Sequence, residues 1–328
     1  MTAPRLDILG IGNAIVDVVA PVEEEFLAKC DLRKGGMTLV DEAAARSLYD
    51  AMPPGRESSG GSAANTCAWA AGLGAKVAYL GKVADDQLGQ VFRHDIQAAG
   101  VHFPSRPLTG GEPTGSCLVL VTPDGERTMS VFLGAAVGFG EPDVDARLVG
   151  DAAITYLEGY LFDPPAAQAA FRRAATLARA AGRQVALSLS DPFCVDRHRA
   201  AFRDLVAGHV DILFANEAEI CSLYETGFEA ACEAARRDAA VAALTRSERG
   251  SRIVRGAETV EVAALPTTVV DTTGAGDAYA AGFLAAYVAG ADLRACAQLG
   301  SAAAAEVISH FGARAQADPQ ELRRTVGV

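Results

Sequence analysis

The amino-acid sequence predicts an α/β fold in which helices cover both faces of a mostly parallel central sheet. Three observations lead to this prediction. From about residue 150 onward, short apolar runs typical of buried strands alternate with helical runs, as in βαβ units. The chain has 328 residues, of which 50% are hydrophobic, so it can bury a full core. Two segments, 14–44 and 108–134, break the alternation with strand-like stretches of their own.

The second half of the chain supplies most of the predicted sheet. Its apolar runs are ITYLEG, QVALSLS, DILFAN and VAALTRS, and helices are predicted over residues 165–181, 196–207 and 216–237. The first third adds the run LDILGIGN, a helix over 62–73, the strand AKVAYLG and a helix over 87–99. Ligands of such sheets bind at the carboxyl ends of the strands. Because no repeat or flexible linker divides the sequence, residues 1–328 are predicted to form a single domain.

The two segments that break the alternation are predicted to form a small β-sheet lid. Residues 108–134 contain the stretches GSCLVLVTPDG and ERTMSVFLG, which predict a hairpin that turns at Pro-Asp-Gly. Strands inserted into a βα chain can form a small sheet that projects over the ligand face. On pattern alone, a plain edge hairpin fits equally well.

The composition argues against several classes of function. The formal net charge is −12, whereas nucleic-acid backbones are bound by clustered Lys and Arg. The longest uncharged apolar stretch, 278–291, is too short to span a bilayer. The N-terminus lacks the apolar core of a secretory signal, and seven scattered cysteines without a CxxC pair fit reduced thiols. We therefore expect a cytoplasmic protein, monomeric or homodimeric, that binds small molecules.

The segment DTTGAGD, residues 271–277, directly precedes an apolar helical run. Gly274 and Gly276 permit backbone angles that turn consecutive amides, including that of Ala275, toward one point at the helix start. These amides and the positive end of the helix dipole attract an anion. We expect Asp277 to stay ionised in that field and to accept a proton from a substrate hydroxyl beside a bound phosphate. Taken alone, the segment also fits an ordinary helix start.

Two glycine-containing segments nearer the N-terminus carry polar side chains suited to hydroxyl groups. The first, GIGNAIVD at 10–17, lacks the third glycine of a dinucleotide fingerprint, and the sequence has no Walker A motif. Its Asp17 can accept two hydrogen bonds from vicinal hydroxyls. In the second, SGGSAAN at 59–65, Gly60 and Gly61 allow a ligand to touch the backbone, and Asn65 offers a donor and an acceptor. A turn Asp and a helix N-cap at Ser62 are the ordinary alternatives.

The segment NEAE, Asn216 to Glu219, is close to a capping box at a helix start. Its functional interpretation is that Glu219 holds a water of Mg²⁺, an ion that keeps much of its hydration shell. A polar turn after the strand VAALTRS offers Thr245, Ser247 and Gly250 for phosphate or ribose contacts.

Taken together in this order, GIGNAIVD, GGSAAN, NEAE and DTTGAGD resemble the ribokinase-like (PfkB) family of carbohydrate and nucleoside kinases. The resemblance spans most of the chain and implies a three-layer α/β/α sandwich with a small β-sheet lid. It also implies ATP as phosphate donor, Mg²⁺, and phosphorylation of a primary hydroxyl. Within the family the chain is most similar to adenosine kinases, on PTGSCL at 113–118, RTMSVFLGAA at 127–136 and VDILFANEAE at 210–219. This similarity implies transfer of phosphate to the 5′-hydroxyl of adenosine, giving AMP and ADP, as in purine salvage.

The resemblance also implies roles for individual residues. The groups that would bind the substrate are Asn13, Asp17, Gly60, Gly61 and Asn65 at the ribose and Met37, Leu39, Met129, Val131, Leu133 and Tyr160 at adenine. The catalytic groups would be Asp277 as the base, the backbone at Gly274, Ala275 and Gly276, and Arg127 closing over the transferring phosphate. ATP would be bound by Asn216, Thr245, Ser247, Gly250, Gly274, Gly276 and Ser301. The metal ligands would be Glu219 for Mg²⁺ through water and, for a possible K⁺, backbone oxygens near Asp271, Thr273, Ile308 and Gly312.

The sequence departs from the family pattern at two positions, and two other functions are alternatives to an adenosine kinase. Ser247 stands where many relatives have Gly, and Ser301 replaces a His that some sugar kinases place near ATP. The same chemistry on a sugar such as ribose or fructose is the first alternative, but a sugar calls for polar lid contacts where Met129, Val131 and Leu133 are apolar. A catalytically silent nucleoside-binding regulator is the second alternative.

Overall fold

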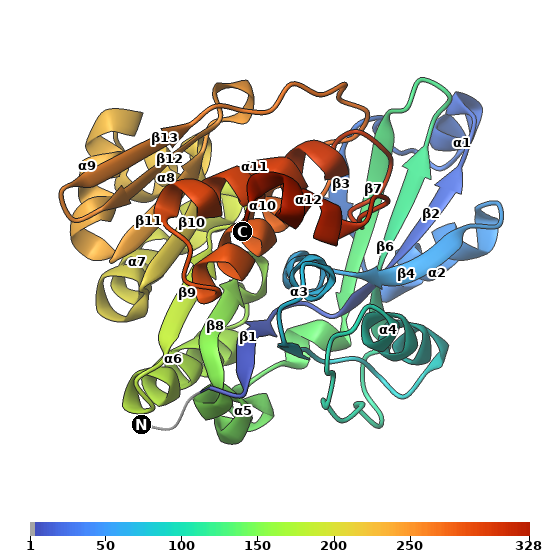
Figure 1. Cartoon of the computed structure of the whole chain (residues 1–328). Coiled ribbons are helices and arrows are strands. Elements are labelled where there is room, and N and C mark those ends of the chain that lie inside the picture. Colours follow the sequence, from blue (N-terminus) through green and yellow to red (C-terminus); the bar gives the residue numbers. More distant parts are fainter. Residues whose placement is uncertain (1–3) are drawn as a thin grey trace.

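The computed structural model describes residues 4–328, which form a large sheet covered by helices and a smaller second sheet beside it (Figure 1). The large sheet has eight strands in the order β13-β12-β11-β10-β9-β8-β1-β5. Neighbours from β5 to β11 run parallel, whereas β11, β12 and β13 pair antiparallel. The strands span β1 Leu6–Ile11, β5 Val77–Leu80, β8 Ala152–Glu158, β9 Gln184–Ser188, β10 Ile212–Asn216, β11 Val241–Thr245, β12 Ser251–Arg255 and β13 Glu258–Val262.

Helices pack on both faces of this sheet because successive strand residues point to opposite faces. In β1, Ile8 belongs to one buried cluster and Leu9 to the other. The first cluster includes side chains of α3 Ser62–Gly72, α4 Gln87–Ala98, α10 Ala275–Val288 and α11 Leu293–Val307. The second includes side chains of α5 Ala146–Asp151, α6 Pro165–Ala180, α7 Pro192–His209, α8 Glu217–Tyr224 and α9 Phe228–Asp238. The predicted α/β sandwich with a mostly parallel sheet is confirmed.

The smaller sheet, which we call the lid sheet, has five strands in the order β3-β7-β6-β2-β4. Its members are β2 Ile15–Pro21, β3 Met37–Leu39, β4 Arg56–Gly60, β6 Thr114–Val121 and β7 Arg127–Gly134. Strands β6 and β7 form an antiparallel hairpin whose turn closes with the Gly125 amide donating to the Thr122 carbonyl at 2.8 Å. Helices α1 Glu24–Lys29 and α2 Glu42–Ala51 lie between lid strands in the sequence, and α12 Pro319–Val326 ends the chain.

Several elements differ from the sequence prediction for local reasons. The helix expected over 216–237 is two helices, because Glu225 adopts a left-handed conformation with φ of 51° at the end of α8. Helix α7 begins at Pro192, where Asp191 caps it, and bends at His198. Strand β12 and the edge strand β13 were not predicted, nor was β4, whose sequence RESSG contains none of the apolar residues typical of a strand.

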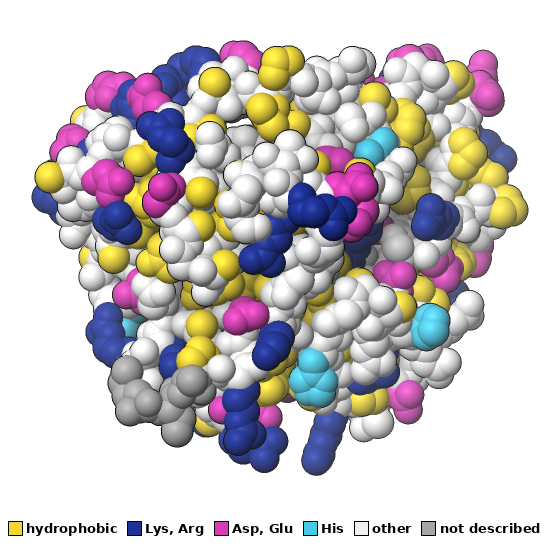
Figure 2. Space-filling view, viewed as in Figure 1, with side chains coloured by type: hydrophobic (Ala, Val, Ile, Leu, Met, Phe, Trp, Pro, Cys, Tyr) yellow, Lys and Arg dark blue, Asp and Glu magenta, His cyan; other side chains and the backbone are white. Residues whose placement is uncertain are grey.

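The remaining sequence expectations concern the surface and the thiols. The space-filling view shows acidic and basic side chains interspersed over the face drawn (Figure 2). The seven cysteines are free thiols. Among residues 4–328, no helix is both long and apolar enough to cross a membrane.

Candidate active site

A cavity of about 2140 Å³ lies between the carboxyl ends of the large sheet and the lid sheet. It takes its walls from both sheets and from the segments before α3 and α10. The sequence-predicted site residues that line it are Asn13, Asp17, Met37, Leu39, Gly61, Asn65, Arg127, Met129, Val131, Leu133, Tyr160, Asn216, Glu219, Thr245, Ser247, Gly250, Thr273, Gly274, Ala275, Gly276, Asp277, Ser301, Ile308 and Gly312. Gly60 and Asp271 are not on the wall, although both contact residues that are.

Helix α10 begins at this cavity with a turn that only glycine fits. Gly274 has φ of 78°, and a Cβ there would lie 2.8 Å from the Cβ of Ala313. The Ala275 amide donates to the Thr272 carbonyl at 3.2 Å, so it is less free than the sequence suggested. The amides of Gly276 and Asp277 have no hydrogen-bond partner within the described chain. Two free amides at a helix N-terminus favour an anion at this end of the cavity.

Asp277 points toward the loop before α3. Its Oδ1 accepts a hydrogen bond from Ser62 Oγ at 2.6 Å, and its Oδ2 accepts one from Asn65 Nδ2 at 3.3 Å. Burial raises the pKa of Asp277 to about 6, against the lowering effect of these two bonds and of the Arg314 charge. The net shift of the Asp277 pKa is upward because desolvation outweighs these contacts. A pKa near 6 still leaves the carboxyl group mostly ionised at neutral pH, as a proton acceptor requires.

The segment Ser59–Ala64, which we call the acceptor loop, folds closely against β2. A Cβ on Gly60 would lie 2.3 Å from Asp17 Cγ. The Asp17 carboxyl group therefore occupies the space that a side chain at residue 60 would need. Gly61 has φ of 94°, and a Cβ there would lie 2.1 Å from the Asn13 carbonyl oxygen. Burial raises the pKa of Asp17 to about 6, and the Asp277 charge adds to this effect. The two glycines thus bring Asn13 and Asp17 beside Asp277 at one corner of the cavity.

Asn65 completes this corner from the first turn of α3. Its amide nitrogen is used by Asp277, while its Oδ1 is buried and has no hydrogen-bond partner among the described residues. A buried acceptor without a partner costs free energy unless a ligand or water donates to it. This corner is therefore prepared to receive a hydroxyl group.

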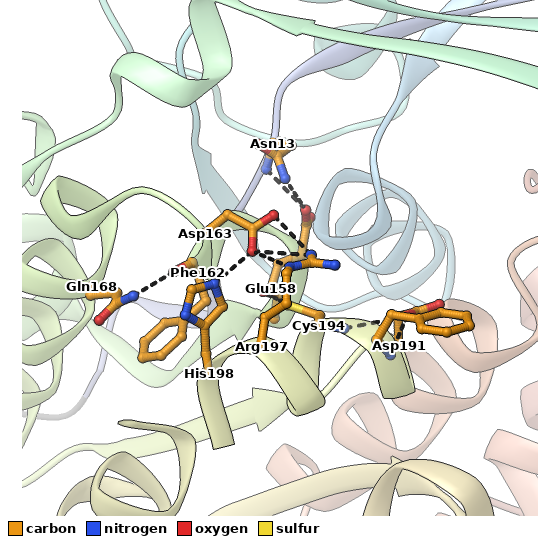
Figure 3. A network of polar contacts seen from close by, with 11 residues as sticks. Asn13, Glu158, Phe162, Asp163, Gln168, Asp191, Cys194, Arg197 and His198 are labelled. Atoms are coloured by element: carbon orange, nitrogen blue, oxygen red, sulfur yellow. Dashed lines mark hydrogen bonds and ion pairs between the residues drawn. The ribbon is translucent and has the colours of Figure 1, made fainter. Parts of the chain in front are cut away.

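Sequence reasoning missed Glu158, which lies at the end of β8 and is 1% exposed. Its Oε1 accepts from Asn13 Nδ2 at 2.8 Å and from the Asn13 amide at 3.2 Å, and its Oε2 accepts from the Ala63 amide at 2.7 Å (Figure 3). Burial raises its pKa to about 7. The carboxyl group thus joins the Asn13 turn to the acceptor loop. A lone charged residue after the apolar run ITYL was the signal that could have identified it.

Sequence reasoning also missed Arg314, in the segment between α11 and α12. Its Nη2 donates to the Ser59 carbonyl at 2.6 Å and to Ser59 Oγ at 2.8 Å, and its Nη1 donates to the Ala64 carbonyl at 3.1 Å. These acceptors are the first and last residues of the acceptor loop. The partners lie about 250 positions away in the chain, so no local pattern marks this residue.

Polar side chains beside Glu158 form a separate group at the cavity rim (Figure 3). Arg197 of α7 makes an ion pair with Asp163, with Nη2 and Oδ2 3.0 Å apart. His198 Nε2 lies 2.7 Å from the other Asp163 oxygen. This group connects the first half of α7 to the segment that follows β8, and the Arg197 side chain is half exposed.

The lid sheet supplies an apolar wall. Strands β3 and β7 pair in parallel with Met37 beside Met129 and Leu39 beside Val131. Met37 and Leu39 are 50% and 57% exposed, which is unusual for side chains of this size on the inner side of a cleft. Leu133 continues the wall along β7, and Tyr160, which follows β8, is 37% exposed. The wall therefore offers free apolar area to a flat or apolar group.

Arg127 begins β7 and lies against the segment before α10. Its Nη2 lies 2.7 Å from Asp271 Oδ2, and its guanidinium carbon lies 5.5 Å from the centre of the Phe311 ring. Its Nε and Nη2 lack hydrogen-bond geometry to any described residue, so the pair depends on charge and not on directed bonds. Asp271 also accepts from the Thr273 amide, from Thr273 Oγ1 and from the Gly312 amide. In this structure Arg127 thus pairs with a carboxylate, whereas the sequence argument places it on a phosphate.

Two of the predicted cation groups, the Ile308 carbonyl and the Glu219 carboxyl group, have hydrogen-bond partners within the protein. The Ile308 carbonyl accepts from the amides of Val270 and Asp271, at 2.8 and 3.3 Å, so both of its lone pairs are used. Glu219 is 5% exposed, and its two oxygens accept from the Asn216 amide and Nδ2 at 2.9 and 2.6 Å. Asn216 Oδ1 in turn accepts from the Glu219 amide, so the capping box is confirmed. Within the described residues, no cluster of three or more His, Cys, Asp or Glu side chains could hold a metal ion.

The far end of the cavity is built from loops. Thr245 ends β11, Ser247 follows with φ of 52°, and Gly250 has φ of 79°. A positive φ at Ser247 is a conformation that glycine adopts at lower cost, which fits the departure noted in the sequence. Ser301 is 8% exposed and faces the same end from α11.

Comparison with known proteins places this geometry in a family. A family model of the pfkB family carbohydrate kinases matches residues 40–320. The chain belongs to this family. The crystal structure of adenosine kinase from Sinorhizobium meliloti is similar with a TM-score of 0.90 and 49% sequence identity, over 98% of this chain and 100% of that chain. The crystal structure of a probable sugar kinase from Rhizobium etli CFN 42 is similar with a TM-score of 0.91 and 46% identity, over 99% of each chain. Adenosine kinase of Saccharomyces cerevisiae is 30% identical over 339 residues, 95% of this chain and 96% of the relative.

Membership of the PfkB family makes this protein an ATP-dependent phosphotransferase that acts on a small molecule. The geometry agrees with that class of reaction. A carboxyl group with a pKa near 6 lies beside free amides at a helix N-terminus, within a cleft that is open between two sheets. The similar chains have names that include both nucleoside and sugar kinases, so the acceptor has to be argued from the cavity itself.

Proposed function

We propose that this PfkB kinase transfers the γ-phosphate of ATP to the 5′-hydroxyl of adenosine, giving AMP and ADP. The observation that carries the choice of acceptor is the exposed apolar wall of Met37, Leu39, Met129 and Val131 facing the hydroxyl-binding corner. A nucleoside has a flat apolar base and a polar ribose, which matches a cleft with one apolar and one polar side. The similarity to adenosine kinase from Sinorhizobium meliloti supports the same choice.

In the proposed site, the ribose hydroxyls bind at Asn13, Asp17 and Asn65. Asp17 accepts hydrogen bonds from vicinal hydroxyls, and Asn65 Oδ1 is the free buried acceptor of this corner. Gly61 allows the sugar to approach the backbone of the acceptor loop, while Tyr160 extends the apolar wall beside the base. Ser62 and Asn65 orient the Asp277 carboxylate by hydrogen bonds.

For the chemical step, Asp277 accepts the proton of the 5′-hydroxyl while the 5′-oxygen forms a bond to the γ-phosphorus. The bond from that phosphorus to the β,γ-bridging oxygen breaks, and ADP leaves with the electron pair. The free amides of Gly276 and Asp277 stabilise the charge on the transferring group. Arg127 adds its guanidinium after it leaves Asp271.

The residues on the donor side fit Mg²⁺ only through water. Both Glu219 oxygens already accept hydrogen bonds from Asn216, and their remaining lone pairs can accept a hydrogen bond from a water of the ion. Among the described residues, no cluster of carboxylates could bind the ion directly. Mg²⁺ bound with ATP neutralises charge on the phosphates. Thr245, Ser247, Gly250 and Ser301 are proposed to contact the nucleotide at this end.

A sugar as acceptor is the second candidate function. The hydroxyl-binding corner at Asn13, Asp17 and the acceptor loop would suit a free sugar equally well, and the probable sugar kinase from Rhizobium etli CFN 42 is 46% identical. A sugar would leave the apolar wall exposed to water, which disfavours this candidate. A catalytically silent nucleoside-binding protein is disfavoured by the position of Asp277 beside free amides.

Release of ADP from MgATP tests the proposal across adenosine, guanosine, inosine, ribose, fructose and 2-keto-3-deoxygluconate. We expect the highest kcat/KM with adenosine. The matched variants Met129→Asn and Leu39→Gln should raise the KM for adenosine about 10-fold while leaving the KM for ATP unchanged, because they remove apolar contact area from the wall. A sugar preferred over every nucleoside would contradict the choice of acceptor, and binding without ADP release would contradict the reaction.

A further inference from the structure

Arg314 reaches the acceptor loop from a distant part of the chain. Its guanidinium donates to Ser59 at the start of the loop and to Ala64 at the end, so one side chain holds both ends. The same segment is fixed at Ala313, whose carbonyl accepts from Trp69 Nε1 at 3.0 Å. The loop between these anchored ends carries Ser62, which donates to Asp277. The position of Arg314 therefore determines where Ser62 meets the carboxylate.

The Arg314 guanidinium has no carboxylate as a direct ion-pair partner among the described residues. Within the described chain its hydrogen bonds go to carbonyl oxygens and to a hydroxyl, and no carboxylate lies within ion-pair distance. The nearest acidic group in the network is Asp95, which accepts from Ser59 Oγ at 2.6 Å. A partly buried guanidinium without a direct counter-ion acts on several anions at once.

Titratable groups face Arg314 from every element around it. These are Asp95 of α4, Asp17 of β2, Cys67 of α3 and Asp277 of α10, with Arg127 of β7 also acting on Asp17 and Glu158 of β8 lying close to Asp277. The Arg314 charge lowers the pKa of both Asp17 and Asp277 against the effect of burial. Burial in turn lowers the pKa of Arg314 itself, although an arginine stays protonated at any physiological pH.

We propose that Arg314 is a positioning residue that holds the acceptor loop at both ends and places a fixed positive charge among the carboxylates of this corner. The proposal rests on the proposed function for its use in catalysis. Its physical content, the coupling of one guanidinium to two carboxylates, does not depend on which acceptor is phosphorylated.

The same segment also contacts the side of the cavity where ATP is expected. The Gly312 amide donates to Asp271 Oδ2 at 3.0 Å, and Asp271 pairs with Arg127 of the lid sheet. Residues 312 to 314 thus contact Asp271 on one side and Ser59 on the other. This arrangement explains why a single arginine in an irregular segment can affect groups on several different elements.

The test measures the titration of Asp17 and Asp277 directly in the ligand-free protein. Carboxyl carbons are labelled in aspartate, and the two resonances are assigned with Asp17→Asn and Asp277→Asn. Because the two groups interact, their apparent pKa values belong to the pair. In Arg314→Gln we expect these values to rise by about 1 pH unit, as for loss of a nearby opposite charge. In Arg314→Lys, which keeps the charge, we expect them to stay within about 0.3 pH unit of wild type.

A second readout separates charge from geometry. Arg314→Lys cannot bond both ends of the loop with one planar fork, so we expect its dissociation constant for the acceptor to rise at least about 5-fold. For Arg314→Gln, we expect the acid limb of kcat/KM to move upward by about the same amount as the titration. If Arg314→Gln does not fold, the acceptor affinity of Arg314→Lys still tests how the loop is held, and wild-type affinity there would overturn the proposal.

Arg323→Gln is the matched control. Arg323 donates to the Leu73 carbonyl at 2.9 Å, at the opposite end of α3 from Ala64, and is not on the cavity wall. We expect this variant to lose thermal stability without moving either titration. Unchanged titrations in Arg314→Gln, or wild-type acceptor affinity in Arg314→Lys, would overturn the proposal. The substrate panel and Asp277→Asn decide the proposed function separately, since the titrations need no substrate and no turnover.

Discussion

The acceptor side and the donor side of the cavity differ in how their polar groups are held. On the acceptor side, Asn13 is hydrogen-bonded to Glu158, and both Glu158 and Asp277 accept hydrogen bonds from the acceptor loop. On the donor side, Thr245, Ser247 and Gly250 lie in a turn, and Arg127 rests on Asp271 by charge alone. The structure therefore combines side chains fixed by hydrogen bonds on the proposed acceptor side with an arginine held by charge alone on the proposed donor side.

The difference indicates how the two substrates are recognised. Fixed groups lose little conformational entropy on binding, which favours selectivity among acceptors. A group held by charge alone, as Arg127 is, can change partners in response to the charge of a phosphate. We therefore expect variants on the acceptor side to change KM for the acceptor, and variants on the donor side to change kcat.

The largest effect is expected at Asp277, where the two sides meet. Asp277→Asn keeps the shape of the side chain but cannot take a proton, so turnover should fall by at least about 10²-fold with acceptor binding near normal. Steady-state kinetics and calorimetric binding of the acceptor measure the two quantities. Asp292→Asn is the control, because Asp292 caps α11 away from the cavity and asparagine caps a helix equally well. Full activity in Asp277→Asn would remove the base from the mechanism.

Arg127→Gln tests the donor side. We expect kcat to fall about 30-fold with little change in the KM for the acceptor, because the guanidinium stabilises charge that develops on the transferring group. Arg127→Lys keeps the charge but lacks the planar fork of donors, so its kcat should lie between those of Arg127→Gln and wild type. A rise in acceptor KM at unchanged kcat would instead assign Arg127 to the acceptor side.

Glu158→Gln tests the preformed character of the acceptor side. A glutamine can accept from only one of the two segments that Glu158 now joins, so Asn13 or the acceptor loop would lose its partner. We expect the KM for the acceptor to rise about 10-fold, equivalent to about 1.4 kcal/mol, and the KM for ATP to stay within about 2-fold. Equal changes in both constants would show that Glu158 supports the fold as a whole.

The smallest effect concerns stability and pH. The folded-state pKa of Asp277, about 6, lies above the ordinary value of 3.8, so the folded protein binds this proton more tightly than the unfolded chain. The stability that the protonated form contributes is fully present below about pH 4 and is lost as the pH rises through 6. Asp277→Asn should therefore be more stable than wild type by about 1 to 2 kcal/mol at pH 8, with a smaller difference at pH 5. Urea denaturation at both pH values measures this, and an equal difference at both would contradict the assignment of burial as the cause.

Sequence reasoning predicted the large sheet well because its strands are apolar runs between helices. It missed β4, since RESSG joins a sheet through backbone pairing with β2 and not through apolar side chains. For the cavity, glycine spacing located the acceptor loop and the start of α10. The side chains that hold those segments, Glu158 and Arg314, could not be found in this way, because their partners lie 95 to 255 residues away in the chain.

The direction of the Asp277 pKa shift could not be predicted for a related reason. The helix N-terminus is visible in the sequence and favours the ionised form. The extent of burial depends on how α3, the lid sheet and the Arg314 segment close around the carboxyl group, which only the folded chain defines. Desolvation then outweighs the local field.

The fit of Asp17 against Gly60 has a consequence for how this family can vary. A methyl group at residue 60 would take the place of the Asp17 carboxyl group, from which it would be only 2.3 Å away. A side chain at residue 60 therefore requires the Asp17 side chain to move or to be replaced by a smaller one, so we expect the effects of substitutions at residues 17 and 60 to depend on each other. In a homologue that carries a side chain at residue 60, we expect the aspartate to be displaced or replaced, and with it this means of holding a pair of hydroxyls.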